Sequence, residues 1–356
     1  MASPTAAARP QAPTAGAAWR KVWKNYYIRR IIKAIVSIFV VTTLTFFLIR
    51  LMPGNPLDIY VTTQMAQGFS REEAVQMAAS MFQIDLQSPM HIQYFNYLKG
   101  LAHLDFGMSI ASTRTPVSAL ILRFLPWTLF VVSVSLVISF TVGVLAGTLM
   151  AYKRNTWVDH VLTSFSSIIT SIPDYMVGTL ILLYAGVRWK LFSTTGVRGS
   201  LSPGVHPEWT FRFLADALYH AGLPIFTYVI TTVGRWMLQM RSSTMSTLGE
   251  DYVMVAKARG LTDGRITGAY VGRNAILPLF TSLAISIGAL FGGSVLIETV
   301  FTYQGIGMKL ASALASRDYP VMQAVFIITT TATVSANLLA DFLYGLLDPR
   351  IRTEGR

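Results

Sequence analysis

The chain has 356 residues, of which 53% are hydrophobic and 13% charged, with a mean hydropathy of +0.49 and a formal net charge of +12. A soluble domain carries about 25% charged residues, so the composition excludes an ordinary soluble protein and indicates a chain embedded largely in lipid. The absence of cysteine excludes disulfides, thiolate metal sites and a cysteine nucleophile. The basic residues do not form an arm with interleaved aromatics away from the apolar runs, which argues against nucleic-acid binding.

The first apolar run begins near Ile31 and is preceded by two segments of different composition. Residues 1–18 are rich in Ala, Pro and Thr, and we expect a disordered tail. Residues 19–30 combine Trp and Tyr with five cations, which is typical of a short helix at the membrane interface. A charged flank without regular structure is the alternative. No small-residue cleavage site follows the apolar run, so we expect it to remain as an anchor.

Six segments are long and apolar enough to form membrane-spanning helices, which need about twenty apolar residues. The sequence therefore predicts an all-α integral membrane protein. Pro173 is expected to disrupt the third span. The fourth is the weakest, because Gly222, Pro224 and Arg235 interrupt its apolar run. In the fifth, Gly288 and Gly292 have a spacing that lets helices approach closely, although they can equally relieve crowding. The predicted spans are residues 31–51, 125–151, 161–187, 220–240, 276–298 and 321–346.

Two polar segments are expected outside the membrane. Residues 52–124 predict a small external helical subdomain between the first and second spans. Within it, Ser70 and Glu73 have the spacing of a capping box, which predicts a helix through about residue 82. Residues 188–219 are rich in Gly and Pro and predict an irregular loop with one short helix near 208–219.

The distribution of Lys and Arg predicts the orientation. Segments 1–33, 152–160, 241–275 and 347–356 hold 17 of the 29 basic residues and 6 of the 17 acidic ones. Because cytoplasmic loops carry the excess of Lys and Arg, we expect these four segments, and therefore both termini, to be cytoplasmic.

The long cytoplasmic segment 241–278 predicts two short helices that meet at Gly260. The first covers residues 251–259, and Gly260 supplies a left-handed C-terminal stop. The second covers about residues 264–275, and Pro278 marks the entry to the fifth span. This pair is too short and too polar to form a hydrophobic core of its own.

The composition of the helix pair suggests a protein partner. Ala256, Ala258 and Gly260 are small and would let another protein's surface approach closely. Lys257 and Arg259 would restrict burial to a groove that satisfies their charge. On physical grounds alone, a solvated amphipathic connector is an equally good interpretation.

The same segment resembles the coupling loop of ATP-binding-cassette (ABC) importer permeases, in which an acidic residue and alanines precede a glycine, and a proline follows some eighteen positions later. Glu250, Ala256, Gly260 and Pro278 fit this pattern. The resemblance is to the oligopeptide/dipeptide/nickel branch and extends from about residue 24 to 352. The strings that carry it are Glu250-Asp251-Tyr252-Val253, Ala256-Lys257-Ala258-Arg259-Gly260-Leu261, Arg273-Asn274-Ala275, Leu277-Pro278, Pro53-Gly54-Asn55-Pro56, His91-x-Gln93-Tyr94-x-x-Tyr97-Leu98, Ser171-Ile172-Pro173, Glu298-x-Val300-Phe301, Gly305-Ile306-Gly307 and Asp348-Pro349-Arg350-Ile351-Arg352.

The resemblance implies a type I ABC importer permease fold with a permease core over residues 125–346, in a prokaryotic plasma (inner) membrane. It also implies a second permease, two ATPase subunits and an extracytoplasmic solute-binding protein. ATP and Mg would be held by the ATPases, and this chain would bind no cofactor. Peptides are the expected solutes, with oligosaccharides or nickel chelates as alternatives. The residues implied to contact the ATPase are Glu250, Asp251, Tyr252, Ala256, Lys257, Ala258, Arg259, Gly260, Leu261, Arg273, Asn274 and Pro278.

Other classes of protein fit the sequence less well. Neither a G-x-x-x-x-G-K-[ST] nor an H-E-x-x-H string occurs, and the five histidines are scattered, so neither an enzyme nor a metal site is predicted. A secondary transporter would need paired titratable groups or inverted repeats, which we do not find. Asp174, Tyr175 and Arg235 are candidate pathway residues at membrane depth. For Arg235, pairing with an acidic residue of another helix is favoured over contact with a solute.

Overall fold

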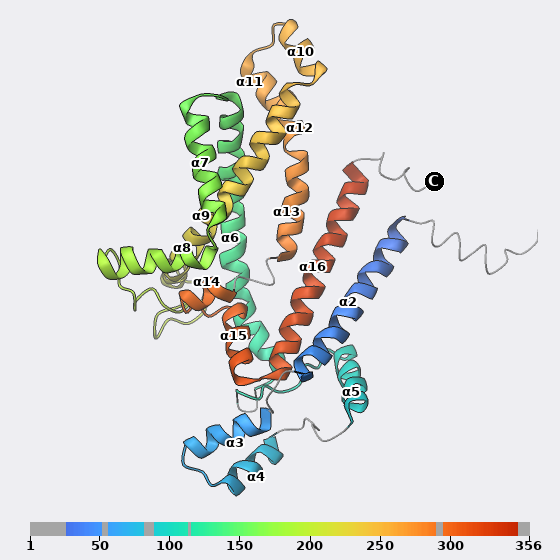
Figure 1. Ribbon diagram of the computed structural model, residues 1–356, viewed down its shortest axis with the longest axis vertical. Helices are drawn as coiled ribbons and strands as arrows, with labels where there is room; N and C mark the ends of the chain where they lie inside the picture. The colour runs from blue at the N-terminus through green and yellow to red at the C-terminus, as the bar shows by residue number, and fades with distance from the viewer. Residues whose placement is uncertain (1–25, 52–55, 82–88, 113–114, 290–294, 348–356) are drawn as a thin grey trace, which may run out of the picture.

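The computed structural model shows an elongated helical molecule, with long helices running side by side between two protruding ends (Figure 1). In the part of the chain that the structure describes, the β pairing found is an isolated bridge between Met108 and Pro116. The all-α prediction is therefore confirmed. The structure describes residues 26–51, 56–81, 89–112, 115–289 and 295–347.

Four helices are individually long and apolar enough to cross a membrane, and two bent helix pairs bring the number of spans to six if each pair counts as one. The four long helices are α2 (Tyr26–Leu51), α6 (Val117–Tyr152), α9 (Phe211–Leu248) and α16 (Tyr319–Leu347). The bent pairs are α7 (Trp157–Ser171) with α8 (Asp174–Ile181) and η1 (Leu182–Arg188), and residues 266–275 with α13 (Leu277–Ala289).

The third predicted span is not one straight helix, because α7 and the α8–η1 segment lie at 98° to each other. The break falls at Pro173, as the sequence predicts. Ile172, the residue before it, has extended backbone angles (φ −93°, ψ 127°), since the proline ring disfavours the helical conformation of its predecessor. In Figure 1, α8 extends sideways from the bundle.

The fourth predicted span is part of a much longer helix. α9 runs without a break through Gly222 and Pro224 and takes in most of the short helix expected near 208–219. The fourth predicted span is confirmed as part of a candidate membrane helix, and the residues that interrupt its apolar run do not break the helix. The side chains of Pro224 and Ile225 are buried, so packing against neighbouring helices outweighs the loss of one backbone hydrogen bond.

α6 and α9 pack closely along their length at a pair of glycines that sequence analysis did not single out. A Cβ at Gly143 would collide with the Cβ of Trp236, and one at Gly147 would collide with the carbonyl oxygen of Met237. Their four-residue spacing allows the two backbones to approach. Gly292 lies outside the described residues, so the spacing of Gly288 and Gly292 stays a prediction.

The remaining predicted segments are described in part. The tail, residues 1–18, most of the 19–30 segment and residues 348–356 lie outside the described residues. Tyr26 to Arg30 form the start of α2, so this portion is not a separate interfacial helix. Arg29 and Arg30, at the end of that segment, therefore belong to the same helix as the apolar run.

The external subdomain contains α3 (Pro56–Ala66), α4 (Arg71–Met81) and α5 (Met90–Ala102). The capping box that starts α4 is confirmed: the Ser70 N–H donates to Glu73 at 2.9 Å, and the Glu73 N–H donates to the Ser70 hydroxyl at 3.2 Å. The hydrogen bond from the Ser70 backbone N–H lowers the pKa of the Glu73 carboxyl.

Two buried carboxylates fasten the segment between the fifth and sixth spans, which holds α14 (Val295–Val300) and α15 (Ile306–Ser316). Glu298 accepts hydrogen bonds from the Thr128 hydroxyl at 2.7 Å and from the Met308 N–H at 2.9 Å. Asp318 accepts from the Ser109 hydroxyl and from two backbone N–H groups of the same turn. α15 was not predicted from the sequence.

Candidate functional site

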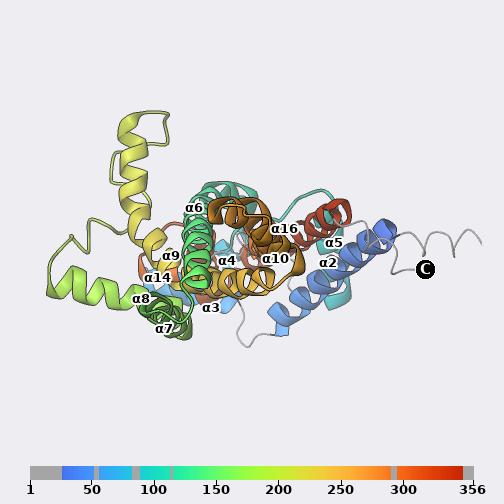
Figure 2. The ribbon, with the colours of Figure 1, turned by 90° about the horizontal axis from the view of Figure 1, so that it is seen from above.

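The segment after α9 projects beyond the other helices at one end of the molecule (Figure 1). Figure 2 looks down on the molecule from this end. Here α10 (Asp251–Ala258) follows α9 after a two-residue turn. Gly260 ends it with φ +72°, the left-handed conformation that glycine adopts without steric cost. The predicted helix stop at Gly260 is therefore confirmed.

The second predicted helix is an almost continuous run of short helical pieces, α11 (Asp263–Arg265), η2 (Ile266–Gly272) and α12 (Arg273–Ala275). It leads directly into α13. The Ser243 hydroxyl of α9 donates to the Ala275 carbonyl at 2.6 Å. This hydrogen bond ties the end of the run back to α9, so the whole segment forms a closed loop of fixed shape.

One side of α10 is buried against the rest of the chain. Val253 is 0% exposed and Ala256 2%, and they belong to a cluster with Trp236 of α9 and Ile266 and Val271 of η2. The interpretation that Ala256 offers a surface to a partner was therefore wrong: its small side chain lets α10 approach the second helical run. The helix pair gains its core by sharing one with the end of α9.

The other side of α10 is exposed and partly apolar. Met254 and Val255 are 56% and 57% exposed, and Tyr252 is also exposed. We call these three side chains the apolar face of α10. Around them lie further exposed predicted residues: Glu250, Asp251, Lys257, Ala258, Arg259, Gly260, Arg273, Asn274 and Pro278. Leu261 is half-buried against the shared core.

A second group of predicted residues lies at the break between α7 and α8. A cavity of about 330 Å³ opens there, lined by Asp174 after the break and by Arg235 of α9. Three α9 side chains, Tyr228, Thr231 and Thr232, complete its polar wall. Tyr175 is exposed but does not line this cavity.

Arg235 is exposed and forms no ion pair with any described residue. The favoured prediction, pairing with an acidic residue of another helix, was therefore wrong for the described chain. The break at Pro173 starts α8 at Asp174, which places this residue at the cavity wall. Arg235 is left facing a cavity that it shares with a carboxylate.

Sequence analysis missed an ion pair near the loop. Arg241 of α9 donates two hydrogen bonds to the Asp159 carboxylate of α7, at 2.6 and 2.8 Å. Asp159 is 2% exposed, and it also accepts from the Asn155 N–H at 3.1 Å. Both residues had been counted as ordinary loop charges, and no spacing rule links positions 82 residues apart.

Across the described ranges, no group of three or more His, Asp or Glu side chains is arranged to hold a metal ion. The features present are six candidate spans, an ordered loop projecting from one end, and a polar cavity at a helix break. They define a multi-pass membrane protein with an exposed, partly apolar loop at one end.

Comparison with known proteins identifies the family. Residues 143–353 match the model of the binding-protein-dependent transport system inner membrane component, and residues 24–132 match the N-terminal model of these membrane components. The chain belongs to this family. It is a permease subunit of a binding-protein-dependent ABC importer, and a transport protein rather than an enzyme.

Individual relatives cover nearly the whole chain. The oligopeptide transport system permease protein AppB of Bacillus subtilis (strain 168) is 31% identical over 326 residues, covering 92% of this chain and 98% of its own. The dipeptide transport system permease protein DppB of Escherichia coli (strain K12) is 32% identical over 344 residues, with the same coverage. The glutathione transport system permease protein GsiC of Escherichia coli O1:K1 / APEC is 28% identical over 328 residues, 92% of this chain and 99% of its own.

Proposed function

We propose that this permease carries peptides and that α10 couples it to two partner ATPase subunits. A second permease would complete the path, and an extracytoplasmic binding protein would deliver the solute. The observation that carries the proposal is the apolar face of α10: Tyr252, Met254 and Val255 are exposed at the tip of a loop held rigid from behind. Exposed apolar side chains with a charged surround are typical of a protein interface.

The coupling follows from the rigidity of the loop. α10 shares its core with α9 through Val253 and Ala256, and Ser243 ties α12 to the same helix. A displacement of α10 therefore moves α9 with it instead of bending a flexible linker. The transporter has an inward-facing and an outward-facing state. ATP shifts the equilibrium between these states only if the ATPases bind ATP more tightly in one state than in the other.

The cavity at the α7–α8 break supports peptides as the solute. Arg235 and Asp174 line it together, and a peptide carries a carboxylate and an ammonium group at its two ends. Thr232, which is half-buried, and its neighbours on α9 supply further hydrogen-bonding groups. The peptide transporters among the relatives agree with this assignment. An oligosaccharide carries no charged group to complement Arg235, which is exposed at this cavity.

The orientation is part of the same proposal. ATPase subunits are cytoplasmic, so α10 must lie on the cytoplasmic side of a prokaryotic plasma membrane. The external subdomain, at the opposite end of the molecule (Figure 1), then faces the binding protein. The excess of Lys and Arg in the segments on the α10 side supports this orientation.

Replacing Met254 by Lys tests the contact. A cation in place of a buried apolar side chain costs an interface about 1.5–3 kcal/mol, so we expect at least about tenfold less ATPase subunit to copurify with the permease from native membranes. The side chain is exposed and absent from the loop's core, so the permease itself should fold normally and retain its second permease.

The matched control is Val75→Lys, which changes an exposed apolar residue of α4 in the external subdomain. It should leave ATPase copurification unchanged. Wild-type recovery of ATPase together with wild-type uptake in the Met254→Lys protein would show that α10 is not the coupling contact.

A further inference from the structure

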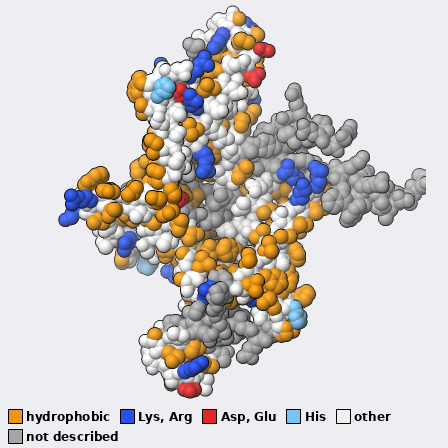
Figure 3. All heavy atoms as spheres, in the orientation of Figure 1, with side chains coloured by type: hydrophobic (Ala, Val, Ile, Leu, Met, Phe, Trp, Pro, Cys, Tyr) orange, Lys and Arg blue, Asp and Glu red, His pale blue; other side chains and the backbone are white. Residues whose placement is uncertain are grey.

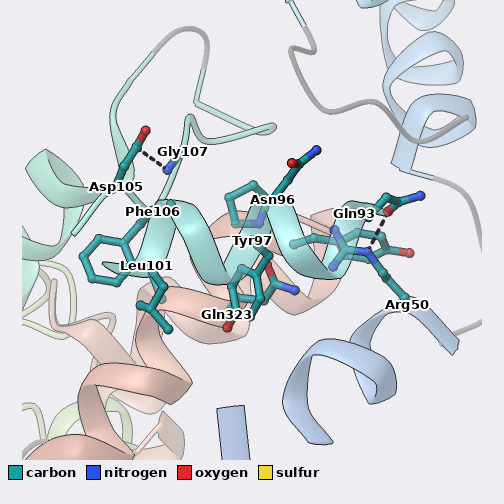
Figure 4. A pocket seen from close by; sticks show the side chains of 13 residues that line it. Arg50, Gln93, Asn96, Tyr97, Leu101, Asp105, Phe106, Gly107 and Gln323 are labelled. Carbon is teal, nitrogen blue, oxygen red and sulfur yellow. Dashed lines mark hydrogen bonds between the residues drawn. The ribbon is translucent and has the colours of Figure 1, made fainter. Parts of the chain in front are cut away.

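A second cavity, of about 250 Å³, lies at the end of α2 remote from α10 (Figure 4). Its walls come from the end of α2, from α5 and from the first turns of α16, and the turn at 105–107 closes one side. The described residues at this cavity that bear on its chemistry are Arg50, Gln93, Asn96, Tyr97, Asp105 and Gln323.

Three side chains that line this cavity each carry a polar atom that is buried without a hydrogen-bond partner among the described residues. They are the Arg50 Nη1, the Tyr97 hydroxyl and the Gln323 Nε2. Gln323 is 6% exposed, and burial raises the pKa of the Tyr97 phenol, which therefore keeps its proton. Three helices thus each contribute one unsatisfied donor beside the same cavity.

The other groups at the cavity are already engaged. Arg50 Nε donates to the Gln93 side-chain oxygen at 2.8 Å, and its guanidinium lies 3.8 Å above the centre of the Phe46 ring. The Asp105 carboxylate accepts the Gly107 N–H at 2.9 Å. These contacts hold the guanidinium in place with Nη1 left over for a ligand.

The donors define the chemistry of the ligand. A buried donor without an acceptor costs about 1–3 kcal/mol, and three of them around one cation favour a ligand with several acceptor oxygens and a negative charge. Phosphate and carboxylate groups have this character. A phosphate group offers more acceptor directions than a carboxylate, which suits donors from three different helices.

The position of the cavity indicates where the phosphate comes from. Leu44, Leu48 and Leu51 form an exposed apolar row on the same last turns of α2, while α5 beside them belongs to the polar external subdomain. On the face shown in Figure 3, hydrophobic side chains cover this region of the molecule. The cavity therefore lies where an apolar membrane surface meets a polar one, which is the depth of lipid headgroups.

We propose that this cavity binds the phosphodiester headgroup of a phospholipid in the leaflet opposite α10. Arg50, Tyr97 and Gln323 bind the phosphate oxygens, and the acyl chains lie along the exposed leucines of α2. Because Tyr94 and Tyr97 of α5 pack on the Phe46 ring of α2, the bound lipid joins α5 to α2 and α16. The proposal rests on the membrane location of the chain and not on the coupling role of α10.

The test is native mass spectrometry of the full-length permease, purified with its partner subunits and stripped of lipid. Three probes are added separately: phosphatidylglycerol, a diacylglycerol with the same acyl chains, and inorganic phosphate. We expect phosphatidylglycerol to bind at one tight site, the diacylglycerol to bind at least about tenfold more weakly, and inorganic phosphate not to displace the lipid.

Arg50→Gln and Tyr97→Phe should each weaken phosphatidylglycerol binding, by about tenfold for Arg50→Gln, because each removes a donor to the phosphate. Tyr97→Phe removes a hydroxyl that makes no hydrogen bond to the described residues, so this variant should fold. It therefore provides the test even if the Arg50→Gln protein fails to fold. Arg123→Gln removes an exposed cation of α6 outside the cavity and is the control.

Three results would overturn the proposal. Equal phosphatidylglycerol binding by wild type and Tyr97→Phe would exclude this cavity. Equal binding of the diacylglycerol would exclude recognition of phosphate. Saturation of the site by inorganic phosphate, with release of the lipid, would assign it to a soluble anion instead.

Discussion

Gly260 ends α10 in a conformation that most side chains resist. Its φ is +72°, and a Cβ there would meet no atom within 4 Å, so the cost of a substitution lies in the backbone alone. For a β-branched residue that cost is about 1–2 kcal/mol or more. We expect Gly260→Val to shift the apolar face of α10 and to reduce peptide-stimulated ATP hydrolysis several-fold in reconstituted transporter.

Gly260→Asn is the matched control, because asparagine tolerates the left-handed conformation better than other residues with a side chain. It should retain most of the stimulated hydrolysis. If Asn and Val variants were equally impaired, the loss would come from the added side chain itself, and the backbone argument would fail.

At the scale of elements, the ion pair between Asp159 and Arg241 joins the first turn of α7 to α9. Removing the Arg241 guanidinium leaves the buried Asp159 carboxylate without its charged partner. Breaking a buried ion pair in this way costs about 3 kcal/mol of folding stability. We therefore expect Arg241→Gln to lower the thermal unfolding temperature of the purified permease.

The double variant Asp159→Asn with Arg241→Gln should lose less stability than the sum of the two single variants, because no uncompensated charge remains. Strictly additive losses would show that the two side chains do not interact in the folded protein. Thermal unfolding in one detergent, at one pH, checks all four proteins.

At the scale of the whole molecule, the absence of cysteine makes the orientation directly testable. A single cysteine at Arg154, in the exposed turn between α6 and α7, should react with a membrane-impermeant maleimide from the cytoplasmic side. One at Trp209, exposed before α9, should react from the outside in intact cells. Labelling of Arg154→Cys from outside would reverse the proposed orientation and remove α10 from the reach of cytoplasmic ATPases.

Several features were predictable because they depend on neighbours in sequence. The apolar runs, the Ser70 capping box, the left-handed stop at Gly260 and the break at Pro173 are set by side-chain polarity or by backbone sterics within a few residues. The class of protein and the resemblance of residues 241–278 to a coupling loop could be predicted for the same reason, since both depend on residues that are contiguous in the sequence.

Other features were decided by tertiary packing. Burial of Ala256, continuity of α9 through Pro224 and the pairing of Asp159 with Arg241 each depend on which helix lies opposite. The same holds for the exposure of Arg235 and for the three unsatisfied donors whose residues line one cavity. Polarity and backbone sterics act locally and can be read along the chain, whereas contacts between helices 80 or more residues apart exist only once the bundle has formed.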